Sequence, residues 1–281
     1  MPAKVITIAI EKGGTGKTLT ASNLAYLMGD EGKRVLCIDT DPQGNLTKAL
    51  SGGLSITSDE FYGKALYNLF DGFLYNSKTS DFVMETNYEN VYMIPCDAQT
   101  TRISKRIEFL IEDTKRLKDG DPKKVLNIGA FLDYFIGQVR DDYDYIIIDT
   151  QPTRDSLLLS NAIFAADYVL IPASCDDNSE ESAFRLYSEC IDMKKSPNSR
   201  LQGAGVLLSN FHKNSATEKK IKEHYEDVLG ASLFSTAIPS SNAVVTSISV
   251  FQPVCFMAKS QPISKAFVKT YEELKRRLGV E

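Results

Sequence analysis

The sequence has little of what marks several large classes of protein. Its 281 residues contain no long hydrophobic run, and the apolar stretch 5–10 is too short for a signal-peptide core or a membrane span. The five cysteines include no C-x-x-C pair and no other close metal-type spacing, so we interpret them as reduced thiols. The net charge is −5, so the chain is not a polycation and would have to bind any nucleic acid through a local patch. We therefore expect a soluble cytoplasmic protein.

The sequence does contain an alternation of short apolar runs and longer helical patterns. Hydrophobic residues make up 43% and charged residues 25%, which excludes a disordered or fibrous chain. Near-continuous apolar strands that alternate with helices predict an α/β fold, a doubly wound and mostly parallel sheet flanked by helices, as a single domain over 1–281. The irregular, aromatic stretch 46–90 is predicted to be a helical insertion. The expected strands are 5–10, 34–39, 91–95, 145–149, 168–172, 205–209 and 233–239, and the expected helices are 17–31, 99–118, 123–140, 154–166, 179–194 and 264–278.

The first predicted strand is followed by a glycine-rich loop, E-K-G-G-T-G-K-T from Glu11 to Thr18, and then by a helix. Glycines allow backbone N–H groups to point at phosphate oxygens, and the helix N-terminus adds partial positive charge. In such a phosphate-binding loop (P-loop), Lys17 would reach the β- and γ-phosphates and the Thr18 hydroxyl would bind Mg²⁺. The strict pattern has glycine where Glu11 stands, so this loop is a variant, with a second lysine, Lys12, near its start.

Three aspartates follow two of the predicted strands. Asp39 and Asp41 lie at the end of strand 34–39 and just beyond it, and Asp149 ends the strand Y-I-I-I-D. A carboxylate at a strand end beside a P-loop can hold Mg²⁺ directly or through its waters, and Asp41 is free to position an attacking water. Each aspartate alone would serve as readily as a turn or N-cap residue. Together with the P-loop, the three predict a nucleoside triphosphate site that uses magnesium.

Three segments, K-G-G-T-G-K-T, D-T-D-P-Q-G-N and Y-I-I-I-D-T-Q-P, together resemble the ParA/MinD family of deviant Walker ATPases, and most closely its ParA-type (Soj-like) DNA-partitioning branch. The resemblance implies a P-loop NTPase fold in which 46–90 varies within the family. It implies that Lys12 reaches across an ATP-sandwich dimer to the second copy's nucleotide, and that Asp41 orients the hydrolytic water. The implied catalytic residues are Lys12, Lys17 and Asp41, the implied nucleotide contacts are Gly13, Gly14, Thr15, Gly16, Lys17, Thr18, Leu19, Asn210 and Pro239, and the implied Mg²⁺ ligands are Thr18, Asp39 and Asp149.

The resemblance also implies a cycle and its partners. An ATP-bound homodimer would bind DNA at the nucleoid without reading its sequence, and a ParB-like centromere-binding protein would stimulate a slow hydrolysis that dissolves the dimer. Leu19 departs from the family, which often has threonine there, and the segment after Pro239 lacks the arginines that bind DNA in many relatives. Residues 201–281 nevertheless carry ten Lys/Arg against seven Asp/Glu. The candidate DNA contacts are Lys213, Lys219, Lys220, Lys222, Lys265, Lys269, Lys275, Arg276 and Arg277.

Other functions use similar motifs. A MinD-type membrane switch needs an apolar face on a terminal helix, and Leu274 and Leu278 are spaced for one, but Glu272 and Glu273 oppose an anionic membrane. No stable membrane association is therefore expected. An electron-transfer iron protein needs paired cysteines around a cluster, and no cysteine closely follows Asp149. An ATPase that positions a protein or membrane-associated cargo remains the alternative, because the motifs predict the ATPase and not its cargo.

Overall fold

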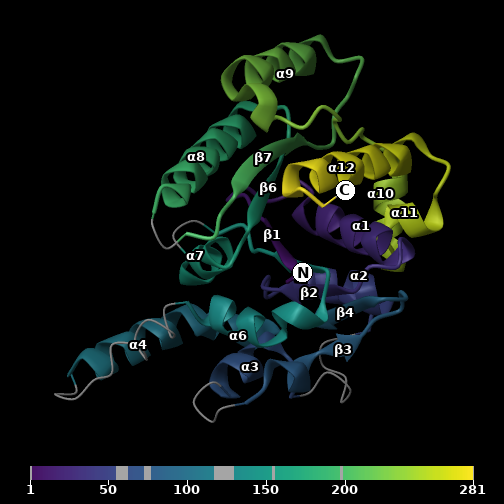
Figure 1. Cartoon of the computed structure of the whole chain (residues 1–281). Helices are drawn as coiled ribbons and strands as arrows, with labels where there is room; N and C mark the ends of the chain where they lie inside the picture. The colour runs from purple at the N-terminus through teal and green to yellow at the C-terminus, as the bar shows by residue number, and fades with distance from the viewer. Residues whose placement is uncertain are drawn as a thin grey trace.

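The computed structural model describes residues 2–54, 63–72, 77–116, 130–153, 156–196 and 199–280. A seven-stranded sheet runs through them in the order β3-β4-β2-β5-β1-β6-β7 (Figure 1). Every pairing is parallel except that of β3 with β4. The expected α/β fold with a mostly parallel sheet is thereby confirmed. The strands are β1 (Lys4–Ile8), β2 (Val35–Asp39), β3 (Met84–Glu85), β4 (Val91–Ile94), β5 (Tyr145–Asp149), β6 (Tyr168–Ala173) and β7 (Gly203–Leu208).

The register of the central strands brings their carboxyl ends to one level. Strands β2 and β5 are buried along their whole length, because each lies between two neighbouring strands and beneath helices. Asp39 of β2 pairs with Asp149 of β5, and Asp149 pairs in turn with Ile8 of β1. A ligand at this end of the sheet would therefore meet the residues that follow β1, β2 and β5 together.

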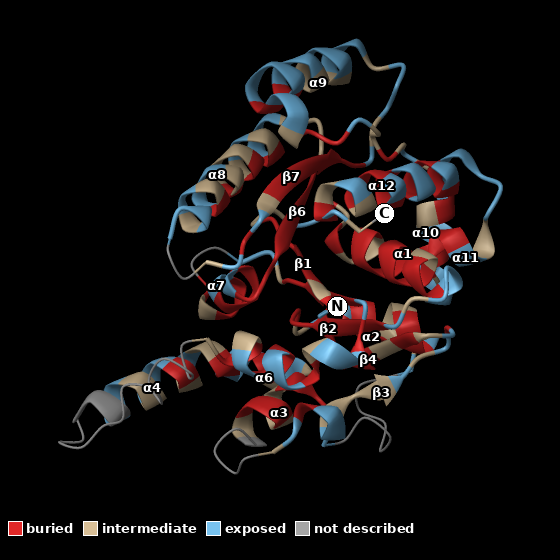
Figure 2. Ribbon diagram, in the orientation of Figure 1, coloured by how far each residue is buried: buried red, intermediate tan, exposed pale blue. Residues whose placement is uncertain are grey.

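Helices cover both faces of the sheet, with the buried residues concentrated between the layers (Figures 1 and 2). On one face, α1, α11 and α12 pack against Ile6 and Ile8 of β1. On the other face, α6 and α7 pack against Ile146 and Ile148 of β5, and α8 packs against β6 and β7. The helices are α1 (Lys17–Asp30), α2 (Asn45–Ser51), α3 (Leu66–Gly72), α4 (Ile103–Arg116), α6 (Phe131–Val139), α7 (Leu157–Phe164), α8 (Asp177–Lys194), α9 (Ala216–Leu229), α10 (Asn242–Val250), α11 (Val254–Met257) and α12 (Pro262–Leu278), with 3₁₀ turns η2 (Thr79–Phe82), η3 (Ala98–Arg102), η4 (Arg140–Asp142) and η5 (Gly230–Ser232).

The expectation of a strand at 233–239 is wrong. This segment runs beside β7 and the residues after it, and it forms only two isolated bridges, Leu233 with Val206 of β7 and Pro239 with Phe211 beyond the strand. Regular pairing along the whole segment would have extended the sheet beyond β7. The segment is instead a loop that follows the last strand and is fastened to it at its two ends.

Backbone hydrogen bonds show why the ladder does not form. The Phe234 N–H donates to the Val206 carbonyl at 2.8 Å, and the Ile238 N–H donates to the Leu208 carbonyl at 2.8 Å. Two steps along β7 are thus matched by four steps along the segment, so the intervening residues bulge away from the strand. Sequence periodicity gives no sign of such a bulge, because every residue in it is compatible with an extended strand.

The other expected elements are present with shifted ends. The helix expected at 99–118 is η3 followed by α4, and the helix expected at 123–140 is described only from residue 130 onward, since 117–129 lie outside the described residues. Of the stretch 46–90, the described parts form α2, α3, η2 and β3. That this stretch varies within a family, and that 1–281 form a single domain, stay predictions. Among the residues described, none of the helices is long and apolar enough to cross a membrane.

Candidate functional site

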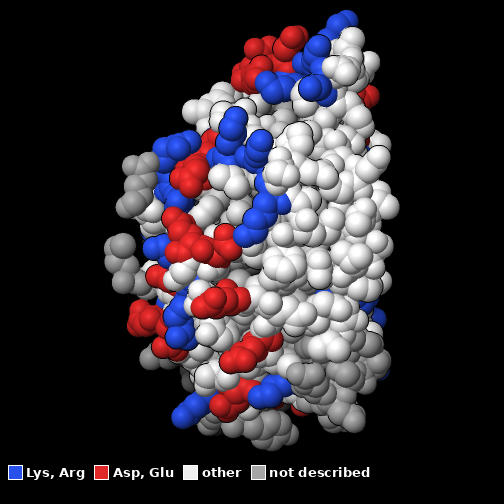
Figure 3. Space-filling view, turned by 90° about the vertical axis from the view of Figure 1, so that its right-hand side faces the viewer, with Lys and Arg blue, Asp and Glu red and all other residues white. Residues whose placement is uncertain are grey.

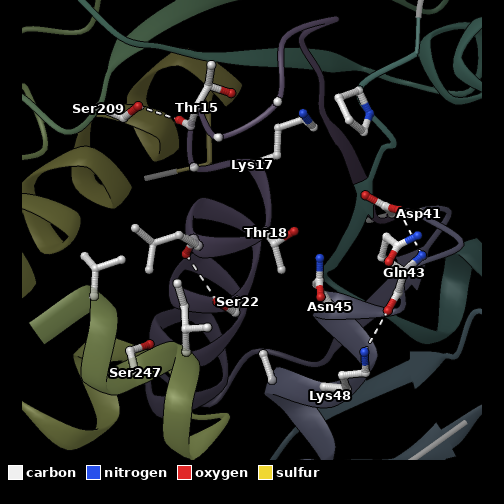
Figure 4. Close-up of a pocket in the computed structure, with 18 of the residues that line it drawn as sticks. Thr15, Lys17, Thr18, Ser22, Asp41, Gln43, Asn45, Lys48, Ser209 and Ser247 are labelled. Carbon is white, nitrogen blue, oxygen red and sulfur yellow. Dashed lines mark hydrogen bonds between the residues drawn. The ribbon is translucent and has the colours of Figure 1, made fainter.

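A cavity of about 850 Å³ lies over the loop between β1 and α1 (Figure 4). In this loop, Gly14 and Gly16 have φ angles of 77° and 87°, in the left-handed region that favours glycine. Gly16 also precedes α1 without any side-chain cap, so the first N–H groups of the helix stay available to an anion. Every predicted nucleotide contact lines this cavity, namely Gly13, Gly14, Thr15, Gly16, Lys17, Thr18, Leu19, Asn210 and Pro239.

Lys17 places a cation at the floor of the cavity. The side chain is buried, and its ammonium donates to the Lys12 carbonyl at 3.0 Å. Burial lowers the pKa of Lys17, while the nearby carboxylates of Asp149 and Asp41 act to raise it. A phosphate group would offer this ammonium stronger acceptors than a single carbonyl does.

Thr18 and Asp149 form the part of the site that fits a divalent cation. The Thr18 hydroxyl donates to Asp149 Oδ2 at 2.7 Å. The other oxygen, Oδ1, is buried and has no hydrogen-bond partner. Burial raises the pKa of Asp149 and the neighbouring Asp39 adds to the effect, while the Thr18 hydroxyl and the Lys17 ammonium act to lower it. A hydroxyl oxygen beside an unpartnered carboxylate oxygen could serve as a pair of Mg²⁺ ligands.

Asp39 lies beside Asp149 but faces the protein. Its Oδ2 accepts from the Thr47 N–H and hydroxyl, each at 2.8 Å, and its Oδ1 accepts from the Asp41 N–H at 3.1 Å. Burial raises the pKa of Asp39 to about 6. Neither Asp39 nor Asp149 lines the cavity, but the two oxygens of Asp39 already have partners. Asp39 thus holds the start of α2 and the Asp41 loop in place through these hydrogen bonds. The predicted role of Asp39 near Mg²⁺ stays a prediction.

Asp41 does face the cavity. Its Oδ1 accepts from the Gln43 N–H at 3.0 Å, which fixes the turn that follows β2. Figure 4 shows Asp41, Lys17 and Thr18 around the same space. A carboxylate held in this way can accept a hydrogen bond from water, and its role with an attacking water stays a prediction.

The opposite wall of the cavity comes from the segments after β7 and before α10. The Ser209 hydroxyl donates to the Thr15 carbonyl, which ties this wall to the P-loop. Asn210 has a φ of 55°, and the Phe211 N–H donates to the Ile238 carbonyl at 3.0 Å, next to Pro239. Asn210 and Pro239 therefore share one wall of the cavity, and their contact with a nucleotide stays a prediction.

Several cavity residues were missed by the sequence reasoning. Gln43 and Asn45 belong to the quoted segment D-T-D-P-Q-G-N, and Gln151 to Y-I-I-I-D-T-Q-P, so these motifs held the signal for them. Ser209 follows the last strand directly, but serine there is too common to have been informative. Lys48 lines the cavity from α2 and had no signal in the sequence.

Comparison with known proteins places this geometry in a family. The family model of the AAA domain matches residues 3–203. The chain is 27% identical to the chromosome partitioning protein ParA of Caulobacter vibrioides over 97% of the chain and 94% of that protein. It is 30% identical to the sporulation initiation inhibitor protein Soj of Bacillus subtilis over 84% of each. The chain belongs to the ParA family of P-loop ATPases.

The fold of this ParA-family chain is shared with a solved structure. A variant of Cyanothece McdA in complex with ATP matches it with a TM-score of 0.77 and 22% identity, over 99% of this chain and 97% of that one. The match extends over nearly the whole of both chains. The expected resemblance to the ParA family is confirmed, and so is the P-loop NTPase type of fold.

Lys12, the second lysine of the ParA-family loop, does not line the cavity. Its ammonium forms an ion pair with Asp176, the residue before α8. The preceding residue, Glu11, pairs with Arg185 of the same helix. No pattern in the sequence links these positions, since Lys12 and Asp176 are 164 residues apart.

The predicted DNA contacts separate into two sets. Arg277 pairs with Glu273 and donates to the Leu233 carbonyl at 2.8 Å, and Lys275 pairs with Glu31 and Glu272. These two side chains hold α12 against its neighbours, and their predicted contact with DNA stays a prediction. Lys222 pairs with Glu226 one turn on. The exposed candidates for which the described part of the chain offers no ion pair are Lys213, Lys219, Lys220, Lys265, Lys269 and Arg276.

Helix α10, which follows Pro239, carries no charge and exposes apolar side chains. Val245 is 69% and Ile248 65% exposed. The whole stretch 228–258 contains no charged residue. On the face that carries α10 and α11, Figure 3 shows a broad uncharged surface, with charged side chains gathered toward the top and along one side. Any contact of this ParA-family chain with DNA phosphates would therefore lie away from α10.

Proposed function

We propose that this chain is a ParA-type ATPase for partitioning DNA, plasmid or chromosomal. It binds ATP with Mg²⁺, forms an ATP-sandwich homodimer that binds DNA without sequence reading, and is switched off when a ParB-like centromere-binding partner stimulates hydrolysis. The observation that carries the proposal is a P-loop with two lysines next to the hydrogen-bonded Thr18 and Asp149, where Oδ1 of Asp149 lacks a partner. The names of the ParA and Soj relatives, which match along most of this chain, support the partitioning role.

Each part of the site has a task in this proposal. Thr18 and Asp149 would hold Mg²⁺, which offsets the negative charge of the phosphates. Lys17 would leave the Lys12 carbonyl for the β- and γ-phosphates, and Asp41 would orient the attacking water. Lys12 would reach the nucleotide of the second copy and stabilise charge on its phosphates. Because two copies are needed to complete the geometry, hydrolysis by the chain alone would be slow.

The proposal is tested by binding to a non-specific DNA duplex at about 50 mM and about 200 mM salt, with ATP, with ADP and without nucleotide. We expect binding with ATP alone, and a loss of affinity at the higher salt. Lys12→Ala is the matched control: it should still bind nucleotide and should lose both ATP-dependent dimers and DNA binding. Equal DNA binding in all three nucleotide states would contradict the proposed switch.

A second candidate is a ParA-family ATPase that positions a protein or membrane-associated cargo. The uncharged, apolar surface of α10 favours it, because surfaces of this kind mark contacts with proteins more often than with phosphates. The same experiment separates the two functions. ATP-dependent dimers that bind no DNA at either salt would support the second candidate, and co-sedimentation with anionic liposomes would then distinguish a membrane from a protein.

A further inference from the structure

The side chain of Lys12 is bound within its own chain. Its ammonium pairs with Asp176, and 30% of the Lys12 side chain and 44% of the Asp176 side chain are exposed. The pair therefore lies at the surface, where one partner of the lysine can be exchanged for another. Since the ammonium does not line the nucleotide cavity, a second copy that needs Lys12 must first take it from Asp176.

The start of α8 fixes the position of Asp176. As the N-cap residue of α8, Asp176 accepts a hydrogen bond from the Ser179 N–H at 3.1 Å, and the Ser179 hydroxyl accepts from the Ser174 N–H at 2.8 Å. Further along the helix, Arg185 pairs with Glu11. Helix α8 thus holds two consecutive residues at the beginning of the P-loop, Glu11 and Lys12.

Lys17 connects this contact to the nucleotide. Its ammonium donates to the Lys12 carbonyl at 3.0 Å. Once Lys17 turns to a phosphate, that carbonyl keeps only the longer hydrogen bond from the Thr15 hydroxyl, at 3.5 Å, and the backbone of Lys12 is held less firmly. The ion pair with Asp176 is then the main contact that still retains the Lys12 side chain.

We infer that Asp176 is a positioning residue for Lys12, which retains this lysine in the monomer and so sets how readily the ATP dimer forms. The inference rests on the proposed function, in which Lys12 acts on the nucleotide of a second copy. Each copy must break one partly exposed ion pair, and a pair of this kind changes an equilibrium constant by a factor of roughly two to five. Because dimer formation breaks two such pairs, they raise the dissociation constant of the dimer by a factor of roughly four to twenty-five.

The test compares Asp176→Asn with Asp177→Asn. Asparagine caps a helix as well as aspartate does, so Asp176→Asn removes the ion pair and keeps the cap. Asp177 is the exposed next residue and has no ion pair within the described chain, so Asp177→Asn matches the charge change. We expect Asp176→Asn to tighten the dimer roughly four- to twenty-five-fold, measured by sedimentation with a non-hydrolysable ATP analogue and Mg²⁺, and Asp177→Asn to leave it unchanged.

A second readout needs no dimer. Without nucleotide, acetylation of the Lys12 amine by a small acylating reagent, followed by peptide mass spectrometry, should be faster in Asp176→Asn than in Asp177→Asn. Equal labelling in the two variants would overturn the retention of Lys12. Faster labelling with an unchanged dimer constant would overturn its effect on assembly. Faster labelling with no dimer in any variant, while nucleotide still binds, would refute the sandwich dimer of the proposed function and with it the positioning role.

Discussion

Asp39 and Asp149 stand side by side in the sheet and have different partners. Asp149 receives one hydroxyl, from Thr18, and keeps Oδ1 without a partner. Asp39 receives the N–H and hydroxyl of Thr47 on one oxygen and the Asp41 N–H on the other. The difference follows from α2, whose first turn approaches Asp39 alone. Asp149 is therefore the carboxylate that keeps an oxygen for a further ligand, although it is buried beneath the cavity lining, and Asp39 supports the loop that presents Asp41.

The raised pKa of Asp39 predicts a pH dependence of stability. Its folded value is about 6, above the usual value of an aspartate, so its stabilising contribution is present at low pH and is lost as the pH rises through 6. The free energy of unfolding of the wild type relative to Asp39→Asn should fall by about 1 kcal/mol between about pH 5 and about pH 8. Urea unfolding in EDTA without nucleotide measures this difference, and a pH-independent difference would contradict the raised pKa.

Asp41 predicts a separation of binding from hydrolysis. Because its carboxylate faces the cavity and only fixes its own turn, Asp41→Ala should bind ATP and accumulate as the ATP dimer. Its turnover should fall roughly a hundredfold or more, the usual contribution of a group that positions a water or takes its proton. Phosphate release and sedimentation with ATP measure the two effects. A variant that stays monomeric with ATP would contradict the assigned role.

The C-terminal helix α12 fastens the loop after β7 to the body of the protein. Glu273 accepts from the Ser235 N–H at 3.0 Å, and Arg277 donates to the Leu233 carbonyl and lies 4.1 Å from the ring centroid of Phe234. The Phe234 N–H donates to β7, so the next N–H, that of Ser235, points away from β7 and donates to Glu273. These contacts hold the segment from the side away from β7.

Arg277→Ala should therefore lower the free energy of unfolding by about 1–3 kcal/mol, because it leaves Glu273 and a backbone carbonyl without their charged donor. Arg276→Ala is the matched control, since Arg276 is exposed and has no ion pair among the described residues; its effect should stay within about 0.5 kcal/mol. Urea denaturation compares the two. Similar losses from both variants would contradict the division between them.

The elements that sequence reasoning located well are those determined locally. Strand β5 has its predicted bounds, because a short apolar run rich in isoleucine between charged neighbours is typical of a buried strand. The P-loop and the residues around it follow from short motifs. The bulge at 233–239 and the Lys12–Asp176 pair could not be predicted, because each depends on a side chain far along the chain that only the fold brings near.

In the part of the chain that the structure describes, several exposed cations without an ion pair gather on the C-terminal helix. On α12, Lys265, Lys269 and Arg276 are spaced so that they lie on one exposed side of the helix, while α10 has no charge at all. If the ATP dimer binds DNA phosphates, these residues offer a row of cations on each copy.

The triple variant Lys265→Ala, Lys269→Ala and Arg276→Ala should lose DNA affinity roughly tenfold or more at low salt and show a weaker salt dependence. ATP-dependent dimers should persist, because none of these residues lines the nucleotide cavity. Fluorescence anisotropy against salt concentration measures both quantities. Replacing Lys78, Lys105 and Lys194 by alanine removes the same charge from other exposed sites of the described chain and should change little. Equal losses from the two triple variants would indicate net charge rather than a specific surface.

The bulge beside β7 also affects how fast its own amide hydrogens exchange with deuterium from the solvent. The N–H groups of Thr236 and Ala237 donate no backbone hydrogen bond within the described structure, whereas those of β5 lie in the centre of the sheet. Deuterium should therefore enter at Thr236 and Ala237 within seconds while β5 resists until the whole molecule opens. Ile238 and Ser240, on either side of Pro239, keep their hydrogen bonds to Leu208 and Phe211, so the fast-exchanging stretch ends where the wall of the cavity begins.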